Sequence, residues 1–192
     1  RGGTVLLATA SSAESSEFPG FLPLTVEYRE NFSAAGKIPG GYYKREGKPS
    51  EREVLTGRLI DRAIRPLFPS NYFNQVQVVI TVYSVDKDYE PNAISLLAAS
   101  LALAYSKIPF MSPVGVVEVG RVDGEWIINP TYPEMKKSDV RFVFAGTDEG
   151  ICMVEGEAAE VKEQEFVDIM FRAHQVIKKL VAWQEKIRSE IG

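Results

Sequence analysis

A segment near the middle of the chain, AISLLAASLALAY, is apolar around nearly the whole circumference of the helix that its pattern predicts. The predicted helix runs from about Asn92 to Ser106. A helix without a polar face has to be covered on every side, so we expect it at the centre of the fold. Ser95 and Ser100 interrupt the apolar run, which stops at Ser106 and Lys107, short of a membrane span. Membrane insertion is therefore not expected.

The segments around this helix favour an α+β fold. Runs rich in β-branched residues predict strands, and Asp123-Gly124 and the sequence TDEG mark the turns of two hairpins. Apolar residues at intervals of three and four predict a long amphipathic helix over about 159–191. Strands are expected over 4–11, 22–30, 74–86, 114–122, 125–130, 140–146 and 151–158. Because no linker or repeat separates these segments, we expect a single domain with helices packed against a mixed sheet.

Basic residues are concentrated in one part of an acidic chain. The whole chain has a net charge of −4, yet eight Lys and Arg residues face only four acidic residues between Lys37 and Arg65. That window carries +4, which leaves −8 for the remainder of the chain. Because electrostatic attraction depends on local charge, the window predicts a local anion site and not a generally basic nucleic-acid protein.

A helix is predicted within this basic window. Ser50 and Glu53 have the spacing of a capping box, and Arg65 precedes a proline, so the helix should begin at about Glu51 and end near Arg65. The stripe expected to face the core comprises Leu55, Leu59, Ala63 and Leu67.

Three arginines lie along another stripe of the same helix. Arg58, Arg62 and Arg65 occupy positions i, i+4 and i+7, and their guanidinium groups suit phosphate or carboxylate ligands. Asp61 lies at helical spacing from Arg58 and from Arg65 and could pair with either. Spacing alone leaves phosphate binding and a structural role equally open.

The segment GGYYKREGKP precedes this helix. It has no periodic pattern and is bounded by glycine and proline, which predicts a projecting loop. The rings of Tyr42 and Tyr43 offer surfaces on which the bases of a single strand can stack, and Lys44 and Arg45 attract phosphates. The alternative is a loop in which one tyrosine packs underneath and the charges are merely solvated.

The longer stretch AAGKIPGGYYKREGKPSEREVLTGRLIDRAIRPLFP closely resembles the first ribonuclease-PH-like core domain of the polynucleotide phosphorylases. The similarity extends over nearly the whole chain from Thr4, through NQVQVVITVYSVD, PNAISLLAASLALAYSKIPF and FVFAGT. The resemblance implies the ribonuclease-PH-like fold, which is also described as ribosomal-protein-S5-domain-2-like. It implies one core domain over 1–192 that lacks its N-terminal strand, hairpin and short helix. The C-terminal helix would lead into an inter-domain helical region.

The resemblance also implies an activity for the longer protein. The family comprises phosphorolytic 3′-to-5′ exoribonucleases, which use inorganic phosphate and Mg²⁺ or Mn²⁺ to release nucleoside diphosphates from single-stranded RNA. Three subunits would form a ring, as part of an RNA-degrading complex, in a bacterial cytoplasm or an organelle. The family loop at Tyr42, Tyr43, Lys44 and Arg45 lines the constriction through which RNA passes. Two Phe and two Arg are usual in that loop. Lys44 therefore has a compact ammonium group where the family has the planar guanidinium group of an arginine.

The family's chemistry belongs to its second core domain, which has a Gly- and Ser-rich phosphate turn and an Asp-x-Lys pair. Here Asn92, Ala93 and Ile94 stand in the place of the turn, and Arg141 and Val143 stand in the places of Asp and Lys. The resemblance therefore implies no catalytic residue and no bound metal in this chain. Arg58, Arg62 and Arg65 would be secondary phosphate contacts or ring-interface residues.

Two other assignments stay open. A non-catalytic ring subunit of an exosome-like assembly would show the same substitutions. A stand-alone ribonuclease-PH-type phosphorylase would require a phosphate turn and a catalytic Asp, and neither stands in its expected place.

Overall fold

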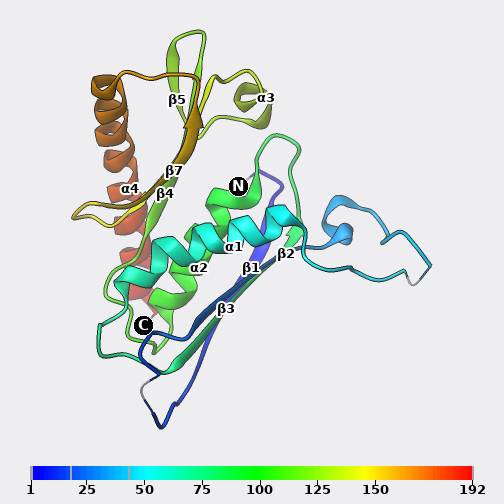
Figure 1. Cartoon of the computed structure of the whole chain (residues 1–192), viewed down its shortest axis with the longest axis vertical. Coiled ribbons are helices and arrows are strands. Elements are labelled where there is room, and N and C mark those ends of the chain that lie inside the picture. The colour runs from blue at the N-terminus through cyan, green and yellow to red at the C-terminus, as the bar shows by residue number, and fades with distance from the viewer. Residues whose placement is uncertain (1, 18, 43, 192) are drawn as a thin grey trace.

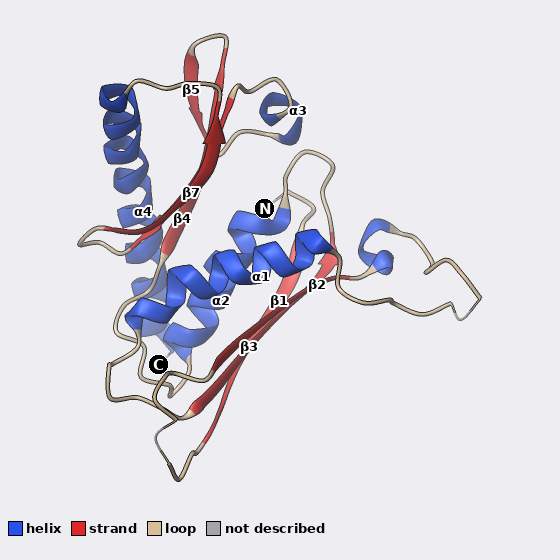
Figure 2. Cartoon of the chain, in the orientation of Figure 1, coloured by secondary structure: helices blue, strands red, loops and turns tan. Residues whose placement is uncertain are grey.

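The computed structural model describes residues 2–17, 19–42 and 44–191, which fold into two sheets and the helices that cover them (Figures 1 and 2). The strands are β1 (Val5–Ala13), β2 (Leu24–Glu30), β3 (Gln75–Ser84), β4 (Gly115–Val122), β5 (Glu125–Ile128), β6 (Val140–Gly146) and β7 (Ile151–Ala158). The helices are α1 (Glu51–Ile64), α2 (Pro91–Tyr105), α3 (Tyr132–Met135) and α4 (Glu163–Ile191), with 3-10 turns η1 (Phe32–Ala35) and η2 (Arg65–Leu67). The predicted α+β class is confirmed.

The first sheet is mixed and has the strand order β1-β3-β2. β1 is antiparallel to the central strand β3, whereas β2 is parallel to it. A parallel pair needs a crossover connection, and α1 lies in the segment that provides it. β3 alternates strictly, and its buried side chains lie on the face that α1 and α2 cover (Figure 2). These buried side chains are Val76, Val78, Ile80 and Val82.

The second sheet is antiparallel throughout and has the order β5-β4-β6-β7. Its two hairpins are those predicted, and Asp123 and Gly124 take the positive φ values, 51° and 81°, that a two-residue turn requires. Both faces of its central strands are buried: Val116 packs toward α2, and Val117 packs toward α4. The apolar stripe of α4 that covers the second face comprises Ile169, Ala173, Ile177 and Val181.

α2 lies between the two sheets, as its sequence predicts. It contacts β1 and β3 on one side and β4 on the other, and no residue from Pro91 to Ala104 is exposed. The hydroxyl of Ser95 donates to the carbonyl of Pro91, and that of Ser100 accepts from the N–H of Val114, so both serines are satisfied inside the core. None of the described helices is long and apolar enough to cross a membrane.

α1 begins where the capping box predicts, because Ser50 and Glu53 exchange the two reciprocal hydrogen bonds. Its core face agrees with the predicted stripe in part. Ala63 is fully buried, and Leu59 and Leu67 are partly buried and pack against the core, whereas Leu55 is 51% exposed. The buried residues are Thr56, Gly57, Ile60, Ala63 and Ile64. Ile60 and Ile64 form an equally regular stripe one position further along, and contact with β2 selects it, since Gly57 lies close to the Val26 carbonyl.

The approach of α4 to β4 depends on Gly115. A Cβ atom at this position would lie 2.7 Å from the carbonyl oxygen and 3.1 Å from the Cα of Ile177. We expect Gly115→Ala to lower the free energy of unfolding by about 1–3 kcal/mol, because the helix backbone has to move away. Urea unfolding measures the loss. Gly150→Ala is the control, since its Cβ would meet no described atom within 4 Å, and equal stability of the two variants would contradict the close approach.

Candidate functional site

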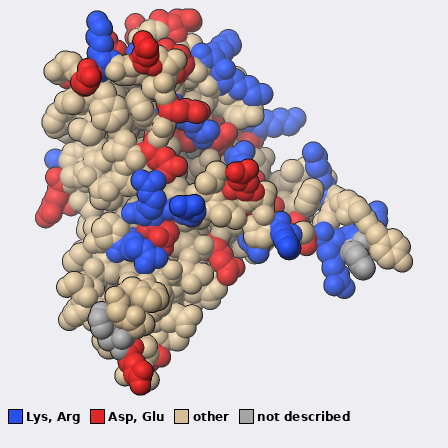
Figure 3. Space-filling view, viewed as in Figure 1, with Lys and Arg blue, Asp and Glu red and all other residues tan. Residues whose placement is uncertain are grey.

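Residues 31–50, here called the arm, project from the body of the molecule between β2 and α1 (Figure 1). Lys and Arg side chains lie along the arm in the space-filling view (Figure 3). Tyr42 is 93% exposed, and Lys44 and Arg45 are exposed beside it. Gly41 and Lys44 have positive φ values of 80° and 52°. The predicted projection of this loop is confirmed, whereas Tyr43 lies outside the described residues.

The carboxylate of Glu53 fastens both ends of the arm to the first turn of α1. One oxygen accepts a hydrogen bond from the N–H of Glu30 at 3.0 Å, where the chain enters the arm. The other accepts from the N–H and the hydroxyl of Ser50, at 2.6 and 2.8 Å, where the chain leaves it. Burial raises the pKa of Glu53, but these hydrogen bonds outweigh burial and lower the pKa overall. The base of the arm is therefore fixed to the core.

The three arginines predicted to share one stripe have different surroundings: Arg58 and Arg62 lie in α1, and Arg65 follows α1 in η2. Arg65 donates to the carboxylate of Asp61 at 2.6 and 2.9 Å and to the carbonyls of Leu22 and Leu24, which ties α1 to the start of β2. Arg62 pairs with Glu155 of β7 at 2.6 Å. Arg58 is exposed and lines a groove between β2 and α1. The sequence left Asp61 free to pair with Arg58 or with Arg65, and the structure shows the pair with Arg65. Contacts of Arg58, Arg62 and Arg65 with phosphate or with a neighbouring subunit stay a prediction.

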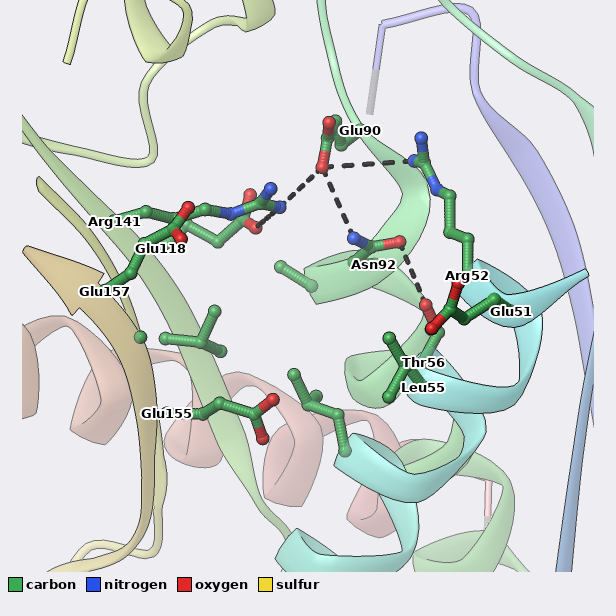
Figure 4. A pocket seen from close by; sticks show the side chains of 14 residues that line it. Glu51, Arg52, Leu55, Thr56, Glu90, Asn92, Glu118, Arg141, Glu155 and Glu157 are labelled. Carbon is green, nitrogen blue, oxygen red and sulfur yellow. Dashed lines mark hydrogen bonds and ion pairs between the residues drawn. The ribbon is translucent and has the colours of Figure 1, made fainter. Parts of the chain in front are cut away.

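A cleft of 560 Å³ lies where α1, the start of α2 and the second sheet meet (Figure 4). Asn92 and Ala93 line it from α2, and Arg141 and Val143 line it from β6. These residues stand in the places of the phosphate turn and of the Asp-x-Lys pair. The structure therefore brings the two separate sequence positions into one cavity.

An arginine bridges two carboxylates inside this cleft. One terminal nitrogen of Arg141 lies 2.6 Å from Glu90 and 3.1 Å from Glu118 (Figure 4). Burial lowers the pKa of Arg141, but the two carboxylates outweigh burial and raise it. Arg52 approaches Glu90 at 3.9 Å, and the amide of Asn92 donates to Glu90 at 3.3 Å. Glu90 is therefore the centre of the polar network in the cleft.

The position of Glu90 is the part of this site that sequence reasoning missed. It is the N-cap residue of α2, at the positive end of the helix dipole, where a bound anion would otherwise lie. Pro91 follows it and supplies no N–H donor. Glu118 was also missed, although a single glutamate in the apolar strand VGVVEVGRV is a signal of a buried, paired charge.

The cleft does not suit the divalent metal that the family uses. The two carboxylates nearest its inner wall, Glu90 and Glu118, already bind the guanidinium group of Arg141, which occupies the place of a cation between them. Within the described residues, no group of three or more His, Cys, Asp or Glu side chains is arranged to hold a metal ion. The carboxylates of Glu90 and Glu118 in this cleft are thus bound to a cationic side chain of the protein itself.

Comparison with protein families divides the chain at the connection between the two sheets. Residues 1–109 match the model described as 3′ exoribonuclease family, domain 1. Residues 112–176 match the model described as 3′ exoribonuclease family, domain 2. The first part contains the mixed sheet with α1 and α2, and the second contains the antiparallel sheet and the first half of α4.

Curated relatives named polyribonucleotide nucleotidyltransferase match the chain over its full length. Those of Geotalea uraniireducens and Thermosipho melanesiensis are 50% and 53% identical over 192 residues, and that of Geobacillus kaustophilus is 49% identical over 191 residues. The chain spans only 26–28% of the length of these relatives. The crystal structure of rice Rrp46 has a TM-score of 0.77 at 14% identity, covering 98% of this chain and 85% of that one, which shows a shared fold.

Replacing Arg141 tests its role in the cleft. We expect Arg141→Ala to lower the free energy of unfolding by about 2 kcal/mol at neutral pH, because Glu90 and Glu118 lose the guanidinium group in a partly dehydrated cavity. Urea unfolding at neutral pH measures the loss.

Arg62→Ala is the matched control for this experiment. Its pair with Glu155 is about half exposed on each side, so its removal should cost less than about 1 kcal/mol. Equal losses in the two variants would contradict the bridging role of Arg141.

Proposed function

Because the chain belongs to the 3′ exoribonuclease family, we propose that it is the first core domain of a polyribonucleotide nucleotidyltransferase, where it guides RNA and helps to form the ring without performing catalysis. The longer enzyme would be a phosphorolytic 3′-to-5′ exoribonuclease. The observation that carries the proposal is the arm, which holds Tyr42, Lys44 and Arg45 exposed on a base fixed by Glu53.

The arm suits a single strand that moves. An exposed tyrosine ring accepts any base by stacking, and flexible Lys and Arg side chains follow the phosphates without reading sequence. Tyr42, Tyr43, Lys44 and Arg45 are the proposed RNA-binding residues. Such contacts hold a strand and still release it at each step, as a processive enzyme requires.

The cleft supports the non-catalytic part of the proposal. Glu90 occupies the start of α2, and Arg141 is already bound by two carboxylates. Further carboxylates of Glu51, Glu155 and Glu157 line the same cavity and repel an incoming phosphate. Inorganic phosphate and Mg²⁺ or Mn²⁺ would therefore be used elsewhere in the longer enzyme.

The assembly and the location are part of the same proposal. We place the chain in a homotrimeric ring, within an RNA-degrading complex, in a bacterial cytoplasm or an organelle. A non-catalytic ring subunit of an exosome-like complex would present a similar arm and cleft. The names of relatives near 50% identity favour the nucleotidyltransferase.

RNA binding by the arm is tested with the double variant Tyr42→Ala, Tyr43→Ala. We expect its affinity for a fluorescently labelled single-stranded RNA to fall by about tenfold or more, because each base that stacks on an aromatic ring contributes about 1–3 kcal/mol. Fluorescence anisotropy measures the dissociation constants. Tyr105→Ala, at the far end of α2 and 46% exposed, is the control and should bind as the parent does. Unchanged affinity in the double variant would refute the role of the arm.

Catalysis is tested with the 192-residue chain, labelled RNA, inorganic phosphate and Mg²⁺. We expect no nucleoside diphosphate, whereas the Geotalea uraniireducens relative supplies the positive control in the same mixture. Chromatography of the products detects release. Phosphate-dependent release by the chain would show that the cleft is catalytic and that Arg141 does not close it.

A further inference from the structure

The arm encloses a second hollow, separate from the cleft. Its volume is 820 Å³, and it lies between the arm, the end of β2 and the first turn of α1. Side chains of both charges and one aromatic ring line it. The basic residues are Arg29, Arg45 and Lys48, the acidic residues are Glu30, Glu46 and Glu53, and the ring is that of Phe32.

The carboxylates around this hollow are engaged by the arm itself. Glu53 accepts hydrogen bonds from the N–H groups of Glu30 and Ser50 and from the Ser50 hydroxyl. Glu46 accepts from the N–H of Phe32 at 2.9 Å. Glu30 accepts from the hydroxyl of Tyr28 at 2.6 Å and lies 3.5 Å from Arg52.

The basic side chains make no ion pair of this kind, although the charge of Arg29 contributes to the lowered pKa of Glu53. Within residues 2–17, 19–42 and 44–191, no carboxylate lies within ion-pair distance of Arg29, Arg45 or Lys48. Although the charges that line the hollow sum to zero, three cationic groups remain able to bind an anion at short range. Phosphate groups are the ligands that arginine and lysine bind best in this way.

Phe32 is a stacking surface with a fixed backbone. Phe32 is 45% exposed although it lines a cavity. Its N–H donates to Glu46, and its carbonyl accepts from the N–H of Lys37 at 2.9 Å, so both backbone polar groups are held. The η1 turn thus holds the backbone of Phe32 in place, so that stacking of a base would order only the side-chain torsions of this residue.

We propose that this hollow is a second nucleotide-binding site, in which one base of a single-stranded RNA stacks on Phe32 and its adjoining phosphates contact Arg29, Arg45 and Lys48. The identity of the ligand rests on the proposed function of the arm. Arg45 belongs to both sites, so a strand held at Tyr42 continues into the hollow. The site binds a nucleotide of any sequence, because it offers an aromatic face and cations for the phosphates.

The test pairs a protein variant with a modified RNA. Fluorescence anisotropy gives the dissociation constants of the chain and of Phe32→Ala for a short labelled RNA and for a series that carries one abasic nucleotide at successive positions. We expect Phe32→Ala to weaken binding of the intact RNA about tenfold. One abasic position should weaken binding to the parent by a similar factor and have no further effect in Phe32→Ala. Phe32→Tyr, which keeps the ring, should restore the parent's affinity.

Two comparisons distinguish loss of binding at this hollow from loss of binding at Tyr42, here called the arm tip, and from a folding defect. Phe171→Ala replaces a phenylalanine that is 61% exposed on α4 and should leave binding unchanged. Tyr42→Ala should cancel the effect of a different abasic position. Parent-like binding by Phe32→Ala beside weakened binding by Tyr42→Ala would overturn the second site and leave the proposed function intact. Weakened binding by Phe32→Ala beside parent-like binding by Tyr42→Ala would support the hollow and refute the arm tip.

Discussion

The burial of α2 is the constraint on which the rest of the structure depends. From Pro91 to Ala104 this helix exposes no residue, so it requires apolar partners on all sides. The mixed sheet covers one side, the antiparallel sheet covers another, and α1 packs alongside. The helix therefore lies between the two sheets and contacts both of them. The boundary between the two family matches falls just after this helix. The cleft opens at the polar N-terminal end of α2.

That end of α2 explains why the cleft differs from an anion site. A helix N-terminus attracts anions because its first N–H groups have no partners within the helix. Here the anion at the helix N-terminus is a side chain of the protein, since Glu90 is the N-cap residue. Its carboxylate contacts the side chains of Arg141, Arg52 and Asn92. Arg141 in turn neutralises the buried carboxylate of Glu118. Arg141, at one of the positions that would carry phosphate chemistry, is thus bound by two carboxylates of the chain itself.

The sequence predicts the elements better than their pairing. The periodicity of α2 and α4, the Asp123-Gly124 turn and the capping box at Ser50 are local signals, and each led to a correct element. The centre of the core face of α1 lies one position later than predicted, because stripes through Leu59 and through Ile60 are equally regular and contact with β2 decides between them. Glu90 and Arg141 are 51 positions apart, so their pairing depends on tertiary structure. The hollow beside Phe32 was missed for the same reason, since residues of β2, η1 and the arm line it.

The first turn of α1 links the arm to the cleft. Glu53 holds both ends of the arm, while the neighbouring Arg52 lies between Glu30 at the arm and Glu90 in the cleft. Tyr28 donates to Glu30 from the core, and burial followed by this hydrogen bond raises the pKa of Tyr28 far above its ordinary range, so the phenol stays protonated as a donor. The base of the arm is therefore hydrogen-bonded to the first turn of α1, whereas Tyr42 lies exposed away from these bonds. In the proposed function and the proposed second site, Phe32 near this base would hold one nucleotide while Tyr42 would contact a neighbouring one.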